Sequence, residues 1–354
     1  MLKPGSSVRW WSIALLLAIG CHREESYDLP LFERKISIAD KFYDIHAFDE
    51  KRAIVVGYAG KVLATADGGN SWTVQPSNTQ EAIYSVDFAD DNHGWACGQD
   101  GLILHTADGG KTWSVQESGT NLYLFAVDFV DPQHGWVVGD RSTYLHTADG
   151  GKTWQIAKIA SIGMEVGGSE EILAEEPILY DVQFLDAATG WIVGEFGNIY
   201  FTTDGGKNWK SQKDTLLGAE GVFNPLDLPT FFGVHFIDRS NGLAVGLDTK
   251  IARTSDGGAN WHFEKFAEGV SQIDPLYRPF QFPDKTAFAV GAVGVTVHQT
   301  APGEPWTRAE LGMEINTWLR GVQFLDKNNG WIVGGYGLIL HTTDGGKSWL
   351  PSFG

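Results

Sequence analysis

The sequence predicts an all-β protein, a seven-bladed β-propeller with four antiparallel strands per blade. Two observations lead to this prediction. The pattern T-x-D-G-G-x-x-W recurs along the chain, and the first two intervals between its copies are 41 residues long. Each interval also contains four short runs of β-branched and aromatic residues, which Gly, Asp and Asn separate. Four strands in a repeat of this length are typical of a propeller blade.

The copies of the pattern set the number of blades. Six are intact, and a seventh, Thr300–Trp306, is one residue short and lacks the Asp. The intact copies occupy residues 65–72, 106–113, 147–154, 202–209, 254–261 and 342–349. In the second unit the expected strands are residues 84–88, 94–98, 102–106 and 113–116.

The repeated pattern has a structural explanation. Asp-Gly-Gly suits a tight turn between the third and fourth strands, because Gly permits positive φ and the short Asp side chain accepts hydrogen bonds from N–H groups of its own turn. The Trp opens the fourth strand, and its ring covers the turn. Equivalent positions on seven blades lie far apart, so a shared catalytic role is excluded. The structural residues are therefore Asp67, Asp108, Asp149, Asp204, Asp256, Asp344, Trp72, Trp113, Trp154, Trp209, Trp261, Trp306 and Trp349.

One face of the propeller is the expected binding surface. Turns between the second and third strands share that face with the crossings from blade to blade. The crossings after Trp154, Trp209 and Trp261 are long, which is frequent in binding loops and also in neutral insertions. The candidate rim around the channel mouth mixes charge with aromatic rings, as peptide-binding surfaces do, although a solvated edge remains an alternative. Its residues are Tyr58, Asp100, Asp140, Arg141, Glu195, Phe196, Asp248, Lys250 and Tyr336.

The N-terminus predicts export. Residues 1–20 carry Lys3 and Arg9, followed by an apolar run too short for a stable membrane anchor, and we interpret them as a lipoprotein-type signal peptide. Acylation of Cys21 would attach the protein to a membrane by lipid alone, with 21–30 as a tether and 31–354 as the propeller. Because His22 and not Asp follows, the periplasmic side of the outer membrane is favoured over the inner membrane. An ordinary cleaved signal is the alternative.

The two chain ends are expected to meet. Residues 31–38 align with the region that begins at a motif Trp in the next unit. We predict that this segment joins blade seven as an outer strand or lies along it. Either arrangement would close the ring and remove an exposed sheet edge.

Composition and motifs exclude several functions. The formal net charge is −18, so nucleic acid is not an expected partner. His105, His146 and His341 are repeat-equivalent and lie on different blades, so we expect no metal site and no cofactor. No HExxH motif or phosphate loop occurs, and the protein is expected not to be an enzyme. Cys97 is expected to be a small buried residue.

Longer segments resemble a known family. "GWIVGEFGNIYFTTDGGKNW" and "GWIVGGYGLILHTTDGGKSW" are similar to the repeat of photosystem II assembly and stability factors, an Asp-box (bacterial neuraminidase repeat) type of propeller, and the resemblance spans about residues 40–350. It implies a non-catalytic scaffold that assists photosynthetic assembly. We therefore expect a monomeric, lipid-anchored propeller that binds a protein or peptide partner during assembly of an envelope or membrane complex. A glycan-binding module or a sialidase-like secreted glycosidase is the alternative, although "YRP" at Tyr277–Pro279 is the only echo of the sialidase Arg-Ile-Pro motif.

Overall fold

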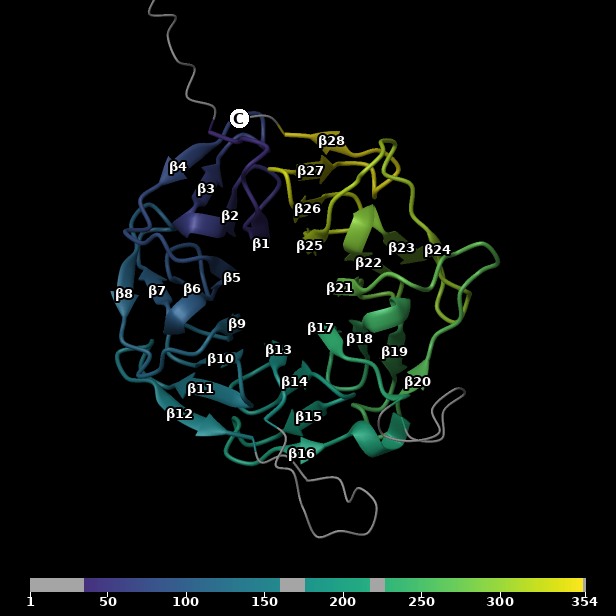
Figure 1. Cartoon of the computed structure of the whole chain (residues 1–354), viewed down its shortest axis with the longest axis horizontal. Helices are drawn as coiled ribbons and strands as arrows, with labels where there is room; N and C mark the ends of the chain where they lie inside the picture. Colours follow the sequence, from purple (N-terminus) through teal and green to yellow (C-terminus); the bar gives the residue numbers. More distant parts are fainter. Residues whose placement is uncertain (1–34, 160–175, 217–226, 353–354) are drawn as a thin grey trace, which may run out of the picture. The chain divides into compact units, whose positions relative to one another are not determined.

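The computed structural model describes residues 35–159, 176–216 and 227–352. These residues form seven four-stranded antiparallel sheets, each built from four consecutive strands. Figure 1 shows the sheets arranged radially, with the first strand of each nearest the axis and the fourth at the outside. The predicted seven-bladed propeller is confirmed. The predicted signal peptide (1–20), the tether (21–30) and Cys21 lie outside the described residues.

The strands follow one order in every blade. The inner strands are β1 (Phe42–Ala47), β5 (Ile83–Phe88), β9 (Leu124–Phe129), β13 (Leu179–Phe184), β17 (Phe231–Phe236), β21 (Leu276–Gln281) and β25 (Leu319–Phe324). The second strands are β2 (Ala53–Gly57), β6 (Gly94–Gly98), β10 (Gly135–Gly139), β14 (Gly190–Gly194), β18 (Gly242–Gly246), β22 (Ala287–Gly291) and β26 (Gly330–Gly334). The third strands are β3 (Val62–Thr65), β7 (Ile103–Thr106), β11 (Thr143–Thr147), β15 (Ile199–Thr202), β19 (Ile251–Thr254), β23 (Thr296–Gln299) and β27 (Ile339–Thr342). The outer strands are β4 (Thr73–Gln75), β8 (Ser114–Gln116), β12 (Gln155–Lys158), β16 (Lys210–Ser211), β20 (His262–Phe263), β24 (Thr307–Arg308) and β28 (Leu350–Pro351). The strands predicted for the second unit are thus correct to within one residue at each end.

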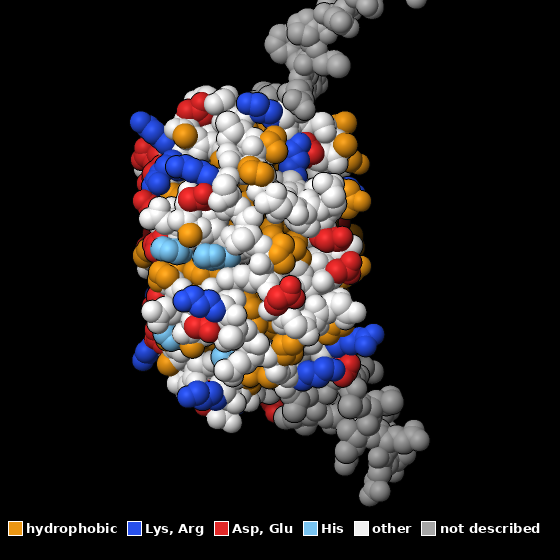
Figure 2. Space-filling view, turned by 90° about the vertical axis from the view of Figure 1, so that its left-hand side faces the viewer, with side chains coloured by type: hydrophobic (Ala, Val, Ile, Leu, Met, Phe, Trp, Pro, Cys, Tyr) orange, Lys and Arg blue, Asp and Glu red, His pale blue; other side chains and the backbone are white. Residues whose placement is uncertain are grey.

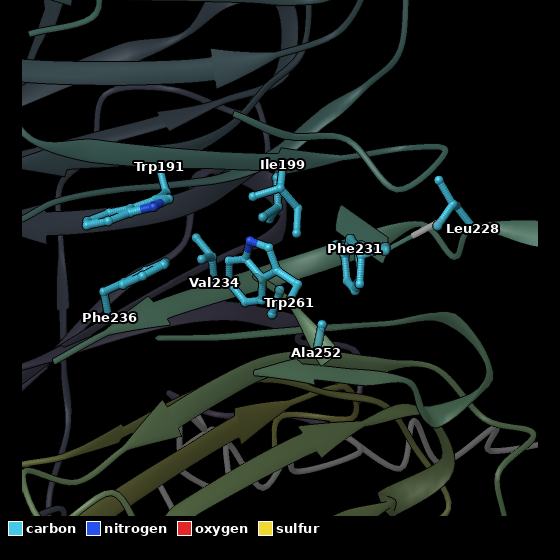
Figure 3. Close-up of a cluster of buried hydrophobic side chains, with 11 residues drawn as sticks. Trp191, Ile199, Leu228, Phe231, Val234, Phe236, Ala252 and Trp261 are labelled. Carbon is cyan, nitrogen blue, oxygen red and sulfur yellow. The ribbon is translucent and has the colours of Figure 1, made fainter. Parts of the chain in front are cut away.

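Aromatic side chains hold neighbouring blades together. Trp191 of β14 stacks on Phe236 of β17 in the next blade, with ring centroids 3.6 Å apart, and Trp261 meets the edge of the same Phe ring (Figure 3). Equivalent stacks join Trp95 to Phe129 and Trp136 to Phe184. Because neighbouring blades cover both faces of the second strand, its side chains are buried throughout, as its continuous apolar sequence requires.

The Asp-box turns have the predicted local structure. The carboxylate of Asp108 accepts a hydrogen bond from the N–H of Thr112 (2.9 Å) and from the hydroxyl groups of Thr106 (2.8 Å) and Thr112 (2.7 Å). The N–H of Gly109 donates to the carbonyl of Asn92, which lies in the turn between the first two strands, so the two turns share a face as expected.

The boxes also connect blades. The indole of Trp95 donates to the carbonyl of Gly150 in the box of the next blade (3.3 Å), and Trp136 donates in the same way to Gly205 (3.0 Å). In the shortened copy, the indole of Trp306 donates to Glu264 of the preceding blade (3.0 Å). The motif is therefore both a turn within a blade and a contact between blades, which extends the sequence-based interpretation.

Ring closure uses inner strands and not an exchanged outer strand. The outermost strand of blade seven is β28, so the predicted outer-strand role of residues 31–38 is wrong for their described part, 35–38. Nearby, the N–H of Gly337 in blade seven donates to the carbonyl of Asp40 (2.8 Å), and Ile36 packs against the core shared by blades seven and one. The predicted alternative, in which the segment lies along blade seven, therefore fits. The amide oxygen of Gln323 also accepts the N–H of Ala47 in blade one (2.6 Å).

The outer edge of the ring is mixed in character. Figure 2 shows charged side chains of both signs among scattered apolar ones. Val74, Val115 and Ile156 are exposed apolar residues of the outer strands β4, β8 and β12. Within the described residues, no helix is long and apolar enough to cross a membrane. Cys97 is buried, as predicted.

Candidate functional site

The inner strands share a distortion that shapes the channel. The pairing of every inner strand with its neighbour skips the second residue, which is therefore a bulge. A bulge redirects a side chain and is frequent next to functional sites. We call these seven half-buried residues the aromatic collar: Tyr43, Tyr84, Phe125, Tyr180, Phe232, Tyr277 and Arg320.

Neighbouring rings of the collar are in contact. Consecutive centroids lie 5.3 Å apart for Tyr43 and Tyr84, 5.6 Å for Tyr84 and Phe125, and 5.6 Å for Phe125 and Tyr180. The series continues through Phe232 to Tyr277 at 4.9 and 5.5 Å. Burial raises the pKa values of Tyr84 and Tyr180 to about 12, so both phenols are neutral at physiological pH.

Arg320 completes the collar. Its guanidinium lies 4.8 Å from the ring centroid of Tyr277, a cation–π contact. Burial lowers the pKa of Arg320, although an arginine remains charged. Among the described residues, no carboxylate lies within 4.0 Å of this guanidinium. The collar therefore offers one positive charge on an aromatic wall.

Arg278 spans the channel next to the collar. Its guanidinium reaches Asp181 of blade four (2.8 Å) and Asp44 of blade one (3.2 Å). Burial acts to lower the pKa of Arg278, but the two carboxylates outweigh it and hold the pKa above its ordinary value. Both carboxylates also accept backbone N–H groups of the adjoining blades, at Val234 and Val86. This three-residue ion cluster thus connects separate blades near the axis.

A polar chamber of about 270 Å³ also borders this ion cluster. The fifth residues of the inner strands line it, and most of them bond to the next blade. Asp87 accepts the N–H of Phe129 (2.8 Å), Asp128 that of Phe184 (2.8 Å), and His235 that of Gln281 (3.1 Å). These contacts indicate that the chamber residues hold neighbouring blades together.

Burial also changes the ionisation of the chamber. It raises the pKa of Asp128 well above the usual value, and the neighbouring carboxylate of Asp87 acts in the same direction. Burial, with a smaller effect of the Arg278 charge, lowers the pKa of His235 to about 4, so its ring is neutral at pH 7. Deprotonation of Asp128 therefore costs more free energy in the folded protein than in the unfolded chain.

The predicted rim lies on the same face as the collar. Gly57 pairs with Phe42, which places the turn at Tyr58 beside the start of β1 and close to the collar residue Tyr43. Six of the nine predicted rim side chains are exposed there: Tyr58, Asp100, Arg141, Phe196, Asp248 and Tyr336. Several of them have positive φ, among them Phe196 (56°) and Tyr336 (58°), which is uncommon for large residues and indicates local strain.

The other three predicted rim residues are half-buried. The carboxylate of Glu195 accepts the N–H of Ile178 (2.9 Å), and the ammonium of Lys250 lies 5.4 Å from the Phe263 ring of the outer strand β20, away from the mouth. Burial raises the pKa of Asp140. Asp100 lines a separate open groove of about 540 Å³ with residues 115–121 of the same blade. The nine predicted rim residues therefore do not all contribute side chains to one surface.

The predicted binding crossings are described in part. Residues 160–175 and 217–226 of the first two lie outside the described residues. The third crossing follows the edge of blade six, where Phe266 pairs with Trp306 in a parallel bridge. In the parts of the chain that are described, no three or more His, Cys, Asp and Glu residues form a group that could hold a metal.

Sequence reasoning missed the collar and the ion cluster. The signal for the collar was present, because an aromatic residue or Arg320 starts each aligned unit, as in "YSVDF", "YDVQF" and "RGVQF". Nothing in the sequence reveals the bulge that turns these residues towards the axis.

Comparison with known proteins identifies the family. The family model of the photosynthesis system II assembly factor YCF48 matches residues 27–122, 113–166 and 222–316. The chain belongs to this YCF48 family. A BNR/Asp-box repeat also matches residues 200–211. The family description is that of an assembly factor and not of an enzyme, in agreement with the sequence-based prediction.

Individual relatives of the YCF48 family are distant. The photosystem II assembly lipoprotein Ycf48 of Synechococcus sp. (strain CC9902) is 28% identical over 144 residues, 41% of this chain and 40% of the relative. The chain thus matches about half of the length of such curated relatives. YCF48 from Cyanidioschyzon merolae has a TM-score of 0.66 at 17% identity, covering 86% of this chain and 96% of that one. A structure of YCF48 bound to D1 peptide has a TM-score of 0.58 at 21% identity, covering 78% and 82%. At these identities the solved structures show a shared fold.

Proposed function

We propose that this protein is a non-catalytic scaffold that binds a peptide segment of a protein partner on the face formed by the rim and the collar. The observation that carries the proposal is the aromatic collar, which opens among exposed aromatic residues of the rim, including Tyr58 and Tyr336. Aromatic side chains with a few charged groups are typical of protein-binding surfaces. A family member of the same fold has been solved with a D1 peptide bound, which supports a peptide as the ligand.

We further propose that acylated Cys21 attaches the scaffold to the periplasmic side of the envelope, with the outer membrane favoured. The apolar run before Cys21 and the name lipoprotein in the relatives support this anchor. The partner would then belong to a membrane or envelope complex under assembly, and a single monomeric propeller would suffice. Replacing Cys21 with Ser should move the protein from the membrane to the soluble fraction; continued membrane recovery after a salt wash would contradict the lipid anchor.

The binding face is tested by a matched pair of triple variants. The rim variant replaces Tyr58, Phe196 and Tyr336 with Asn, a residue that tolerates positive φ. The edge variant also introduces Asn, at Val74, Val115 and Ile156. These are exposed apolar residues of the outer strands, so this variant controls for the loss of surface apolar area.

The readout is recovery of co-purified envelope proteins from the detergent-solubilised host, measured by quantitative mass spectrometry. We expect the rim variant to lose a partner that the wild type and the edge variant both retain. A reduction of about tenfold corresponds to the loss of roughly 1.4 kcal/mol of binding free energy, which is modest for three aromatic contacts. Equal recovery by all three proteins would reject this face as the binding site.

A further inference from the structure

The charge of Arg320 has no counterpart within the fold. The described part of the chain contains seven arginines, and five of them pair with carboxylates: Arg52, Arg239, Arg253, Arg278 and Arg308. Arg141 has no such pair but is exposed, so water solvates it. Arg320 is the unpaired arginine inside a cavity, where burial lowers its pKa. An unpaired charge away from bulk water is costly to the fold.

The two acidic side chains of the neighbouring ion cluster already have hydrogen-bond donors. Asp181 lines the same cavity, but one of its oxygens accepts from Arg278 and the other from the N–H of Val234. Asp44 accepts from Arg278, from the hydroxyl of Ser85 and from the N–H groups of Ile45 and Val86. Arg278 itself repels Arg320. The guanidinium of Arg320 is therefore free for an external anion.

The cavity around Arg320 is small and mostly aromatic. Its volume is about 40 Å³, and the collar rings of Tyr43, Tyr180 and Tyr277 are among its walls. That volume is equivalent to roughly three water molecules, which matches the three heavy atoms of one carboxylate group. The cavity therefore has room for a carboxylate beside the guanidinium.

We propose that Arg320 is the receptor for the carboxylate of a glutamate or aspartate side chain in a bound peptide segment. This inference rests on the proposed function and specifies the partner chemistry. The peptide crosses the face on the rim turns, and one acidic side chain points into the collar, where it forms a charge-assisted hydrogen bond with Arg320. The aromatic wall excludes water and strengthens that pair. In this net-acidic protein, the position also selects acidic segments that the remaining surface would repel.

The test begins with peptide selection on the mature full-length protein. The library displays random dodecapeptides whose C-termini are covalently joined to the carrier. The peptides therefore have no free C-terminal carboxylate, and their only carboxylates are those of Asp and Glu side chains. Selections run in parallel on the wild type and on Arg320→Gln. We expect the wild-type pool to be enriched in Glu or Asp at one fixed position, and the Arg320→Gln pool to lack this enrichment.

Synthetic peptides from the wild-type pool, acetylated and amidated at their ends, then supply a double-mutant cycle by calorimetry. Replacing the selected Glu with Gln should weaken binding to the wild type about tenfold or more and to Arg320→Gln less than about twofold. Arg308→Gln is the control, because it removes an exposed arginine from the outer strand β24, away from the rim and the collar; the Glu-to-Gln ratio should stay at its wild-type value. Arg320→Gln should melt at or above the wild-type temperature, because it removes an unpaired charge, and this would show that the loss is one of binding and not of folding.

The outcomes separate the two proposals. If wild-type peptides bind but show no acidic position, or if the Glu-to-Gln ratio is the same in Arg320→Gln, the role of Arg320 is overturned while the binding face stands. If the wild type selects no peptide from this library but does select peptides from a second library with free C-termini, the side-chain assignment is overturned. If the wild type selects no peptide and the rim variant recovers the same envelope proteins as the wild type, both proposals fail.

Discussion

Replacing Arg278 with Met tests how far one ion cluster holds the ring together. The substitution keeps an unbranched side chain but leaves Asp44 and Asp181 without their cation, and these two carboxylate side chains are only 7% and 4% exposed. Removing one partner of a buried ion pair costs about 3–5 kcal/mol, because the remaining charge stays desolvated. We expect a loss of this size in the free energy of unfolding at pH 7.5, measured by urea denaturation with tryptophan fluorescence.

The pH dependence identifies the cause. Burial raises the pKa of Asp181, and the charge of Arg278 opposes this effect. Without the guanidinium the pKa of Asp181 in the folded variant rises further above the unfolded value, so the folded state binds more protons and the deficit shrinks as the pH falls. The triple variant with Asn at both Asp positions should recover most of the loss, since the amide oxygen still accepts the backbone N–H groups. Arg239→Met is the control, because the pair of Arg239 with Asp186 (2.7 Å) is exposed and should contribute less than about 1 kcal/mol. A loss in Arg278→Met no larger than the control, or one independent of pH, would refute the assignment.

Two further stability predictions follow from single carboxylates. Asp108→Ala removes three hydrogen bonds from a largely exposed box turn and should lower the free energy of unfolding by about 1–2 kcal/mol. The hydrogen bonds with Thr112 are the main cause that holds the pKa of Asp108 to about 2, so this loss of stability should fade as the pH falls from about 4 towards 2. The control Glu310→Ala, at an exposed residue, should cause no such loss of stability. Asp128→Asn removes a carboxyl group whose pKa burial raises in the folded protein, but retains an acceptor for the N–H of Phe184. It should therefore stabilise the protein at pH 7, with the gain shrinking as the pH falls. A destabilised Asp128→Asn protein in the same urea titration would show that the carboxyl group itself is needed.

The fold was predictable because its main signals are local. Each Asp-Gly-Gly turn and each strand-length run carries its own evidence, and seven repetitions exclude a chance pattern. The shared face of the box turns and the first turns also follows from strand alternation, and the bond from Gly109 to Asn92 confirms it. For the described residues 35–38, the outer-strand alternative failed because the short segment at Leu350–Pro351 pairs with β27 and already forms the outer strand of blade seven.

The site was less predictable because it depends on contacts between blades. A bulge at Tyr43 or Tyr180 leaves no mark in the sequence, since an aromatic residue at the start of a strand reads as ordinary core. Arg278 meets partners 97 and 234 residues away, and only the closed ring brings them together. The position of the Lys250 side chain was not predictable for a different reason. Its turn lies at the channel mouth, but its long side chain extends to Phe263 on the outer strand.

Departures from the repeat have their greatest effect at the axis, because only there do equivalent positions from different blades come within reach of one another. The third residue of the inner strand shows this. It is Asp44 in blade one and Asp181 in blade four, but Gly233 in blade five and Gly321 in blade seven, the two blades that flank Arg278.

A side chain at either glycine would collide with its surroundings. A Cβ at Gly233 would lie 2.5 Å from the carbonyl oxygen of Tyr277 and 3.2 Å from the Cα of Arg278, and one at Gly321 would lie 3.3 Å from the Cα of Asp44. The absent side chains let the inner strands approach closely, and the guanidinium of Arg278 then passes both flanking blades to reach its two carboxylates. Neutralising Asp44 and Asp181 in this way leaves Arg320 as the one uncompensated charge of the collar, so the asymmetry of the axis creates a single anion receptor within a ring of seven similar blades.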